Sequence, residues 1–165
     1  MVTTARSIRP ATTADAGAIA AIYNEAVLTS TATFDLEPET VAARLAWLVA
    51  SSTRLCLVGE TRGRVAGWSA LSRWSSRGGY DRTAEASIYV APDAQRSGLG
   101  LALAGAALEA APGLGLHVVI AQICADNAAG LALAAILGFD RVGTLREVGL
   151  KFGRTLDVAI CERLV

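Results

Sequence analysis

Cysteine is scarce in this chain of 165 residues, and the three that occur, Cys56, Cys124 and Cys161, lie far apart in apolar runs. No Cys-x-x-Cys pair is present, and the single histidine, His117, is the only imidazole available as a metal ligand. This spacing offers neither a disulfide framework nor a metal site. We expect three buried free thiols and no metal, with His117 in a structural role.

An excess of one charge is also missing, because fifteen basic residues balance fifteen acidic ones. Without a Lys/Arg cluster the chain lacks the electrostatic footprint of a polyanion binder, which argues against nucleic acid as a partner. The most apolar stretch, residues 98–111, contains Glu109 and falls short of the roughly 20 residues that a membrane helix needs. Residues 1–15 contain no apolar signal core, so we expect a cytoplasmic protein without membrane association.

Hydrophobic residues nevertheless make up 53% of the chain, which at this length predicts one globular domain over residues 1–165. The first half predicts an edge strand at "SIRPA", helices beginning near Thr13 and Pro38, a hairpin of "LCLVGET" and "VAGWSAL", and a strand at "AEASIYV". The second half predicts a helix ending near Ala111, a strand "HVVIAQI", a helix over 127–137 and strands around "RVGTLRE" and "LDVAICERL". This order indicates an α/β (α+β) fold, with a mixed, mostly antiparallel central sheet flanked by helices on both faces.

The hexapeptide "QRSGLG", residues 95–100, stands between a predicted strand and a predicted helix and contains two glycines. Glycine at these positions lets an anionic group approach the backbone N–H groups of a helix start, which predicts a phosphate-binding turn. A Walker loop is excluded because Gly-Lys occurs nowhere in the chain, and a dinucleotide fingerprint fails because Leu103 occupies its third small-residue position. A glycine-rich helix start without a ligand is the alternative that this turn alone leaves open.

The turn matches the Q/R-x-x-G-x-G/A pattern of the GNAT acetyltransferases. Residues 80–100, "YDRTAEASIYVAPDAQRSGLG", closely resemble the phosphinothricin and methionine-sulfoximine N-acetyltransferases of that superfamily. The segments "IRPAT", "IYNEAV", "TATFDLEPET", "LGF" and "LREVGLKFGRTLD" resemble further pieces of the same family in the same order. The resemblance implies a GNAT fold and transfer of an acetyl group from acetyl-CoA to the α-amino group of a small amino acid or a close analogue.

The family uses a glutamate as general base, and the matching segment places that glutamate at Glu85. An amine with a pKa of about 9.5 is mostly protonated at neutral pH, and a base must remove the proton before the nitrogen can attack a thioester. The resemblance therefore implies that Glu85 takes this proton, directly or through a water. A glutamate that is salt-bridged to Arg82 or Arg77 is the structural alternative.

Acetyl-CoA is implied along the end of the same strand and the turn after it. The family's arrangement puts the thioester oxygen on the backbone N–H of Tyr89 or Val90 and pairs the main chain of Ile88 to Val90 with the pantetheine arm. Asn127 is implied near that arm, although helix capping alone would explain it. The residues implied around the pyrophosphate are Gln95, Arg96, Ser97, Gly98, Leu99, Gly100 and Leu101.

Substrate recognition is implied at two loops. Arg77 is expected to pair with a substrate carboxylate or phosphinate, Tyr80 to donate a hydrogen bond, and Phe34 to wall the side-chain pocket. Gly78 and Gly79 complete the expected substrate loop, in which a solvated surface arginine is the alternative for Arg77. The partner expected here is a small amino-acid-like amine.

Three departures from the family pattern bear on the mechanism and the substrate. Ala134 stands where many relatives place a histidine or tyrosine suited to protonating the leaving thiolate, so water or another residue must serve. Thr155 replaces a residue that is commonly aromatic, and Ser75 stands where a basic residue can occur, which leaves the particular amino acid open.

Two other functions are compatible with this sequence. One is acetylation of a protein N-terminus or another amine on the same fold, and the other is a non-catalytic CoA-binding module. The family also implies a homodimer whose C-terminal segments lie beside the neighbouring active site. The apolar Val148, Leu150 and Phe152 in "EVGLKFGRT" are consistent with such a partner.

Overall fold

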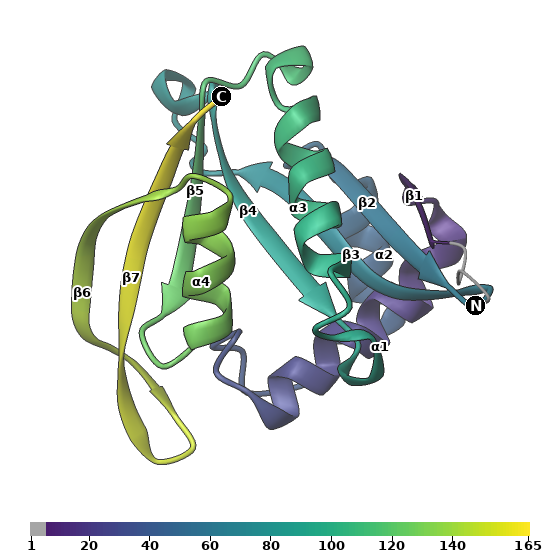
Figure 1. Cartoon of the computed structure of the whole chain (residues 1–165), viewed down its shortest axis with the longest axis horizontal. Coiled ribbons are helices and arrows are strands. Elements are labelled where there is room, and N and C mark those ends of the chain that lie inside the picture. Colours follow the sequence, from purple (N-terminus) through teal and green to yellow (C-terminus); the bar gives the residue numbers. More distant parts are fainter. Residues whose placement is uncertain (1–5) are drawn as a thin grey trace.

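The computed structural model describes residues 6–165 and is organised around a seven-stranded sheet (Figure 1). The strand order is β1-β2-β3-β4-β5-β7-β6, in which β4 and β5 run parallel and the other neighbouring pairs run antiparallel. This sheet confirms the expected mixed, mostly antiparallel architecture. The strands are β1 (Arg6–Pro10), β2 (Thr53–Thr61), β3 (Arg64–Arg73), β4 (Thr83–Val90), β5 (Val118–Cys124), β6 (Asp140–Lys151) and β7 (Arg154–Leu164).

Four α-helices of the described chain cover the two faces of the sheet (Figure 1). Helices α1 and α2 lie on one face, and α3 and α4 lie on the other. The helices are α1 (Ala16–Thr29), α2 (Val41–Val49), α3 (Leu99–Ala110) and α4 (Ala128–Ile136). Short 3-10 turns are η1 (Thr13–Asp15), η2 (Gly78–Tyr80), η3 (Pro92–Ala94) and η4 (Pro112–Leu114). None of these helices is long and apolar enough, within the described chain, to cross a lipid bilayer.

The second helix begins later than the sequence pattern predicted. Its first residue is Val41, three positions beyond Pro38, because the Thr40 hydroxyl accepts a hydrogen bond from the Ala43 N–H at 3.1 Å and caps the helix there. Residues 31–40 instead form an extended loop that returns to α1, where the Asn24 side chain hydrogen-bonds both backbone groups of Glu39. This loop lies next to the site described below.

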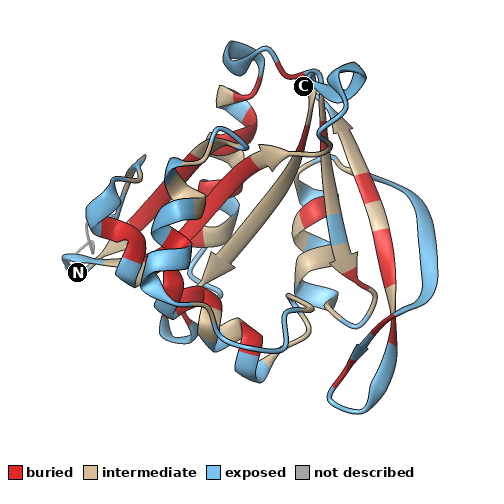
Figure 2. Ribbon diagram, turned by 180° about the vertical axis from the view of Figure 1, so that it is seen from behind, coloured by how far each residue is buried: buried red, intermediate tan, exposed pale blue. Residues whose placement is uncertain are grey.

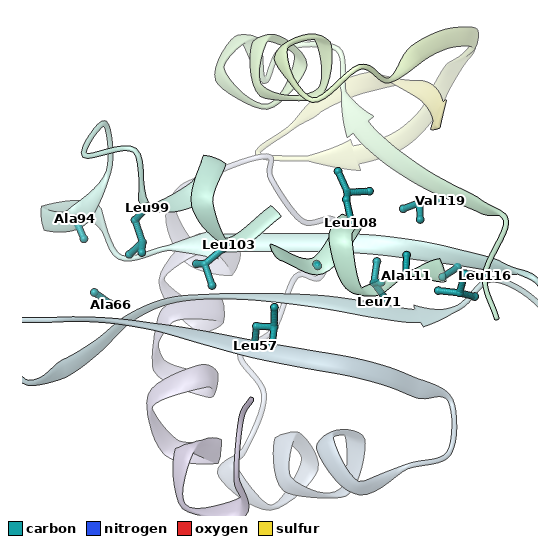
Figure 3. Close-up of a cluster of buried hydrophobic side chains, with 12 residues drawn as sticks. Leu57, Ala66, Leu71, Ala94, Leu99, Leu103, Leu108, Ala111, Leu116 and Val119 are labelled. Atoms are coloured by element: carbon teal, nitrogen blue, oxygen red, sulfur yellow. The ribbon is translucent and has the colours of Figure 1, made fainter. Parts of the chain in front are cut away.

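Two buried clusters hold the helices on the sheet. On one face Ile19, Val27, Val58 and Trp68 join α1 to β2 and β3. On the other face, α3 contributes the buried Leu99, Leu103 and Leu108 (Figure 3). A Cβ at Gly59 would lie 2.7 Å from Leu99 Cδ1, so glycine there permits α3 to approach β2 closely. The three cysteines are buried and free, as expected.

Candidate active site

The strands β4 and β5 separate near the middle of the sheet (Figure 1). β4 pairs with β3 from Ala84 to Val90, but it pairs with β5 at three positions, of which Glu85↔Ile120 is the last. Beyond that pair, the edge of β4 that faces β5 has no strand partner in residues 6–165. Its backbone donors and acceptors are therefore open to an extended ligand, in the manner of an added strand.

An open cavity of about 1430 Å³ occupies this gap. It is lined from both faces of the sheet, because residues of α1 and the 31–40 loop meet residues of α3 and α4 around it. Nine of the expected cofactor residues line it: Ile88, Tyr89, Val90, Gln95, Arg96, Gly98, Gly100, Leu101 and Asn127. Ser97 and Leu99 do not line it, since the Ser97 hydroxyl donates to the Ala94 carbonyl at 2.6 Å and Leu99 is buried in the core.

The turn before α3 has the geometry of an anion site. Gly98 adopts φ +82° as the N-cap of α3, a conformation that suits glycine, and Arg96 is also in the left-handed region at φ +57°. The first helical hydrogen bond runs from Ala102 N–H to the Gly98 carbonyl. The N–H groups of residues 96–101 accordingly find no acceptor within the described chain, and the helix dipole adds positive potential there. This arrangement favours the phosphate-binding interpretation of the turn.

The N-terminus of α4 forms another wall of the cavity. Asn127 caps this helix, with its Oδ1 accepting from the Gly130 N–H at 2.9 Å. A Cβ at Gly130 would lie 2.7 Å from Asn127 Nδ2. The absence of a side chain at Gly130 therefore leaves room for the Asn127 amide to cap the helix. Within residues 6–165 the Nδ2 group makes no hydrogen bond and is free to donate. Ala134 also lines the cavity, and it brings no proton donor.

Glu85 lies at the point where the two strands part. Residues alternate along a strand, so Glu85 shares its face with Tyr89, which packs against the α1 cluster. Its Oε1 accepts a hydrogen bond from Gln122 Nε2 at 3.0 Å. No residue in 6–165 forms an ion pair with Glu85; the nearby arginines Arg54 and Arg73 pair with Asp81 instead. The salt-bridge alternative with Arg82 or Arg77 is therefore absent from this structure.

The two expected substrate loops fall in different places. Phe34 lines the cavity. The exposed η2 turn (Gly78–Tyr80) and Arg77 directly before it do not line the cavity, and Tyr80 is 47% exposed. The structure thus brings Phe34 together with Glu85 and the phosphate turn, and leaves residues 77–80 outside that group. Their part in substrate binding stays a prediction.

The loop that presents Phe34 is fastened on both sides of that residue. Lys151, which is 3% exposed, donates from Nζ to the Thr33 carbonyl at 2.8 Å. The Tyr23 hydroxyl donates to Asp35 Oδ2 at 2.6 Å, and burial raises the pKa of Tyr23 to about 12, so it remains a donor at neutral pH. Burial lowers the pKa of Lys151 from its usual value. Neither Tyr23 nor Lys151 was predicted from the sequence, because the partner of each lies in a different segment of the chain.

A buried arginine forms the floor beneath this loop. Arg44 is 3% exposed, and its guanidinium carbon lies 4.4 Å from the ring centroid of Tyr23 and 4.6 Å from that of Trp47. It pairs with Glu39 at 2.6 Å. The spacing of Arg44 and Trp47 on one helix face could have indicated such a stack. The cluster gives the cavity a rigid aromatic wall on the α1 side.

An open strand edge, a helix-start turn with free N–H groups and a carboxylate without an ion pair line one cavity, an arrangement that suits an acyltransferase acting on a nucleotide-linked thioester. The sequence profile of the Acetyltransferase (GNAT) family matches residues 19–139. The chain belongs to this family, and it is an acetyl-CoA-dependent N-acetyltransferase. The resemblance inferred from the sequence is confirmed.

Three individual acetyltransferases are similar to this chain over nearly its whole length. The chain is 38% identical to the L-methionine sulfoximine/L-methionine sulfone acetyltransferase of Pseudomonas paraeruginosa, over 94% of this chain and 92% of that protein. It is 38% identical to the phosphinothricin N-acetyltransferase of Streptomyces viridochromogenes, over 94% of this chain and 86% of that protein. The Salmonella typhimurium protein yncA, solved with acetyl-CoA as its cofactor, superimposes with a TM-score of 0.93 at 37% identity, covering 97% of this chain and 94% of that one.

Proposed function

We propose that this chain acetylates the α-amino group of a small amino acid or analogue of the phosphinothricin, methionine sulfoximine or methionine sulfone type. The observation that carries the proposal is the position of Glu85, a carboxylate without a cationic partner in the described chain, in the same cavity as the phosphate-binding turn. The names of the relatives support this class of substrate. The amine would approach Glu85 from the α1 side of the sheet.

Acetyl-CoA is proposed to enter from the α3 side. Its pyrophosphate would sit on the N–H groups of residues 96–101, and its pantetheine arm would lie along Ile88 to Val90, with Asn127 Nδ2 as a further donor. Successive backbone groups of an antiparallel strand point alternately to its two neighbours. Whichever of Tyr89 and Val90 directs its N–H away from β3 would stabilise the oxyanion.

The proposed reaction is a direct attack. Glu85 accepts a proton from the substrate ammonium, directly or through a water, and the freed nitrogen pair forms a bond to the thioester carbonyl carbon. The nitrogen of the tetrahedral adduct then loses its second proton to solvent water, the oxyanion collapses, and the carbon–sulfur bond breaks with its electron pair leaving on the CoA thiolate. The products are an N-acetyl amide and free CoA. Ala134 supplies no proton, so water is proposed to protonate the thiolate, which is a modest demand for a thiol with a pKa of about 8.5.

A homodimer is proposed as the working unit. β6 is an edge strand of the sheet and is exposed along most of its length (Figure 2). Apolar side chains stand on it with more than two fifths of their surface open: Val142, Leu145, Val148 and Leu150. A second copy covering this strand would bury them and would bring its own segment close to the substrate side of the cavity. Light scattering of the purified protein tests this.

The function is tested by following thiol release from acetyl-CoA with phosphinothricin, methionine sulfoximine, methionine sulfone, the common amino acids and a peptide with a free N-terminus. We expect turnover with a small amino acid or analogue, and a loss of at least about 10²-fold in Glu85→Gln with unchanged acetyl-CoA affinity. Glu109→Gln, on the exposed side of α3, is the matched control and should retain full activity.

Two results would contradict the proposal. Turnover with the peptide alone would assign the enzyme to protein N-termini. Tight acetyl-CoA binding without thiol release in the presence of any amine would indicate a CoA-binding module without catalysis.

A further inference from the structure

The amide of Gln122 bridges the gap that opens between β4 and β5. The last backbone pair between these strands is Glu85↔Ile120, and Gln122 lies two residues beyond it on the same face of β5. Its Nε2 nevertheless reaches Glu85 Oε1 at 3.0 Å. A side-chain hydrogen bond thus continues across the strands at the level where their backbones have separated.

We infer that Gln122 is a positioning residue for the general base, an inference that rests on the proposed role of Glu85. An ionised carboxylate can only accept hydrogen bonds, so the amide must turn its NH₂ group toward Glu85 and its own oxygen away. One carboxylate oxygen is then held, and Oε2 is left without a donor among residues 6–165. Gln122 therefore fixes the rotation of the carboxylate and presents Oε2 to the amine proton.

A purely structural role explains this contact poorly. Gln122 is exposed and Glu85 is half-buried, and a hydrogen bond between such groups contributes little to the free energy of unfolding. Gln122 makes no other side-chain hydrogen bond within the described chain, and both residues line the same cavity. Substituting Gln122 should therefore change the chemical step while leaving the fold intact.

A double-mutant cycle tests the inference on the full chain. Gln122→Met keeps the length of the side chain and removes its donor. We expect kcat for the amine to fall about tenfold, because the carboxylate loses its fixed orientation toward the amine proton. The KM for acetyl-CoA and the midpoint of thermal unfolding should stay within about twofold and about 1 °C of the parent values. In the Glu85→Gln background, Gln122→Met should cause less than a twofold further loss.

The outcomes separate this inference from the function on which it rests. An equal loss in both backgrounds, or no loss in the parent, would overturn the positioning role while acetyl transfer stands. If the parent chain acetylates none of the amines, both the positioning role of Gln122 and the proposed function are overturned. An NMR titration of the Gln122 side-chain amide gives a readout without turnover: its resonances should move with pH in the parent and stay fixed in Glu85→Gln. Resonances that stay fixed in the parent would also overturn the inference.

Discussion

Replacing Gly149 by alanine should disturb amine binding and leave acetyl-CoA binding unchanged. A Cβ at Gly149 would lie 2.1 Å from Cε2 and 2.6 Å from Cδ2 of Phe34. Ordinary carbon contacts require about 3.5 Å, so the ring would have to retreat by about 1.4 Å. The loop cannot simply shift with it, because Lys151 holds the Thr33 carbonyl and Tyr23 holds Asp35 on either side of the ring.

The size of the effect follows from that displacement. Phe34 must leave its position or rotate into a less favourable rotamer, which costs about 1–3 kcal/mol of stability in an overpacked site. A pocket wall that moves by the size of a methyl group changes discrimination by roughly 10- to 200-fold. We expect the KM for the amine to rise about tenfold. The phosphate-binding turn lies on other elements, so the KM for acetyl-CoA should change by less than about twofold.

Steady-state kinetics with each substrate varied in turn measures both constants. Gly143→Ala on the same strand is the matched control, because a Cβ there would meet nothing within 4 Å, and it should behave as the parent. In a Phe34→Ala background, Gly149→Ala should raise the KM for the amine little further, because the aromatic ring with which the new Cβ clashes is then missing. An unchanged KM for the amine in Gly149→Ala, or an equal rise for both substrates, would refute the reasoning.

Further substitutions test other parts of the structure. Asp15 has a pKa lowered from 3.8 to about 2, chiefly by its hydrogen bonds from Arg9, so it stabilises the fold above about pH 4 and loses this effect as pH falls toward 2. Asp15→Asn should cost about 2 kcal/mol in denaturant unfolding at pH 7 and flatten the decline below pH 4. Gly98→Ala, at φ +82°, should cost about 1–2 kcal/mol and weaken acetyl-CoA binding by calorimetry, whereas Gly63→Ala, at φ +74° in the β2–β3 turn, should cost stability alone. Lys151→Met should leave the Thr33 carbonyl unsatisfied and raise the KM for the amine several-fold with little change for acetyl-CoA.

Local patterns in the sequence were sufficient for the order of elements and for the glycine-containing turn at the start of α3. The alternation of apolar residues and the glycines at 98 and 100 act over a few residues, and the structure confirms the elements that they predict. The start of α2 was placed too early, because Pro38 is a permissible first residue whereas Thr40 makes the actual cap. Here a specific side-chain hydrogen bond outweighed a general preference.

Contacts between distant segments could not be predicted in the same way. Lys151 meets Thr33 across 118 positions, and Gln122 meets Glu85 across 37, and nothing in the neighbourhood of either residue indicates its partner. The exposed η2 turn was expected at the substrate site from the family resemblance, and whether it lines the cavity depends on how the chain leaves β3. The turn before α3 could be predicted because its sequence pattern is local, whereas the hydrogen bond between Gln122 and Glu85 could not.

The parting of β4 from β5 also divides the chain into two consecutive stretches. Strands β1 to β4 come from residues 6–90 and β5 to β7 from residues 118–164, and three residue pairs join the two groups of strands in the sheet. A thioester cofactor lying in the gap would touch both groups at once, so its binding would add to the cohesion between them. At a concentration one hundred times its dissociation constant, such a ligand contributes about 2.7 kcal/mol. Saturation with cofactor would then slow hydrogen exchange along both facing strand edges together, because one ligand contacts both.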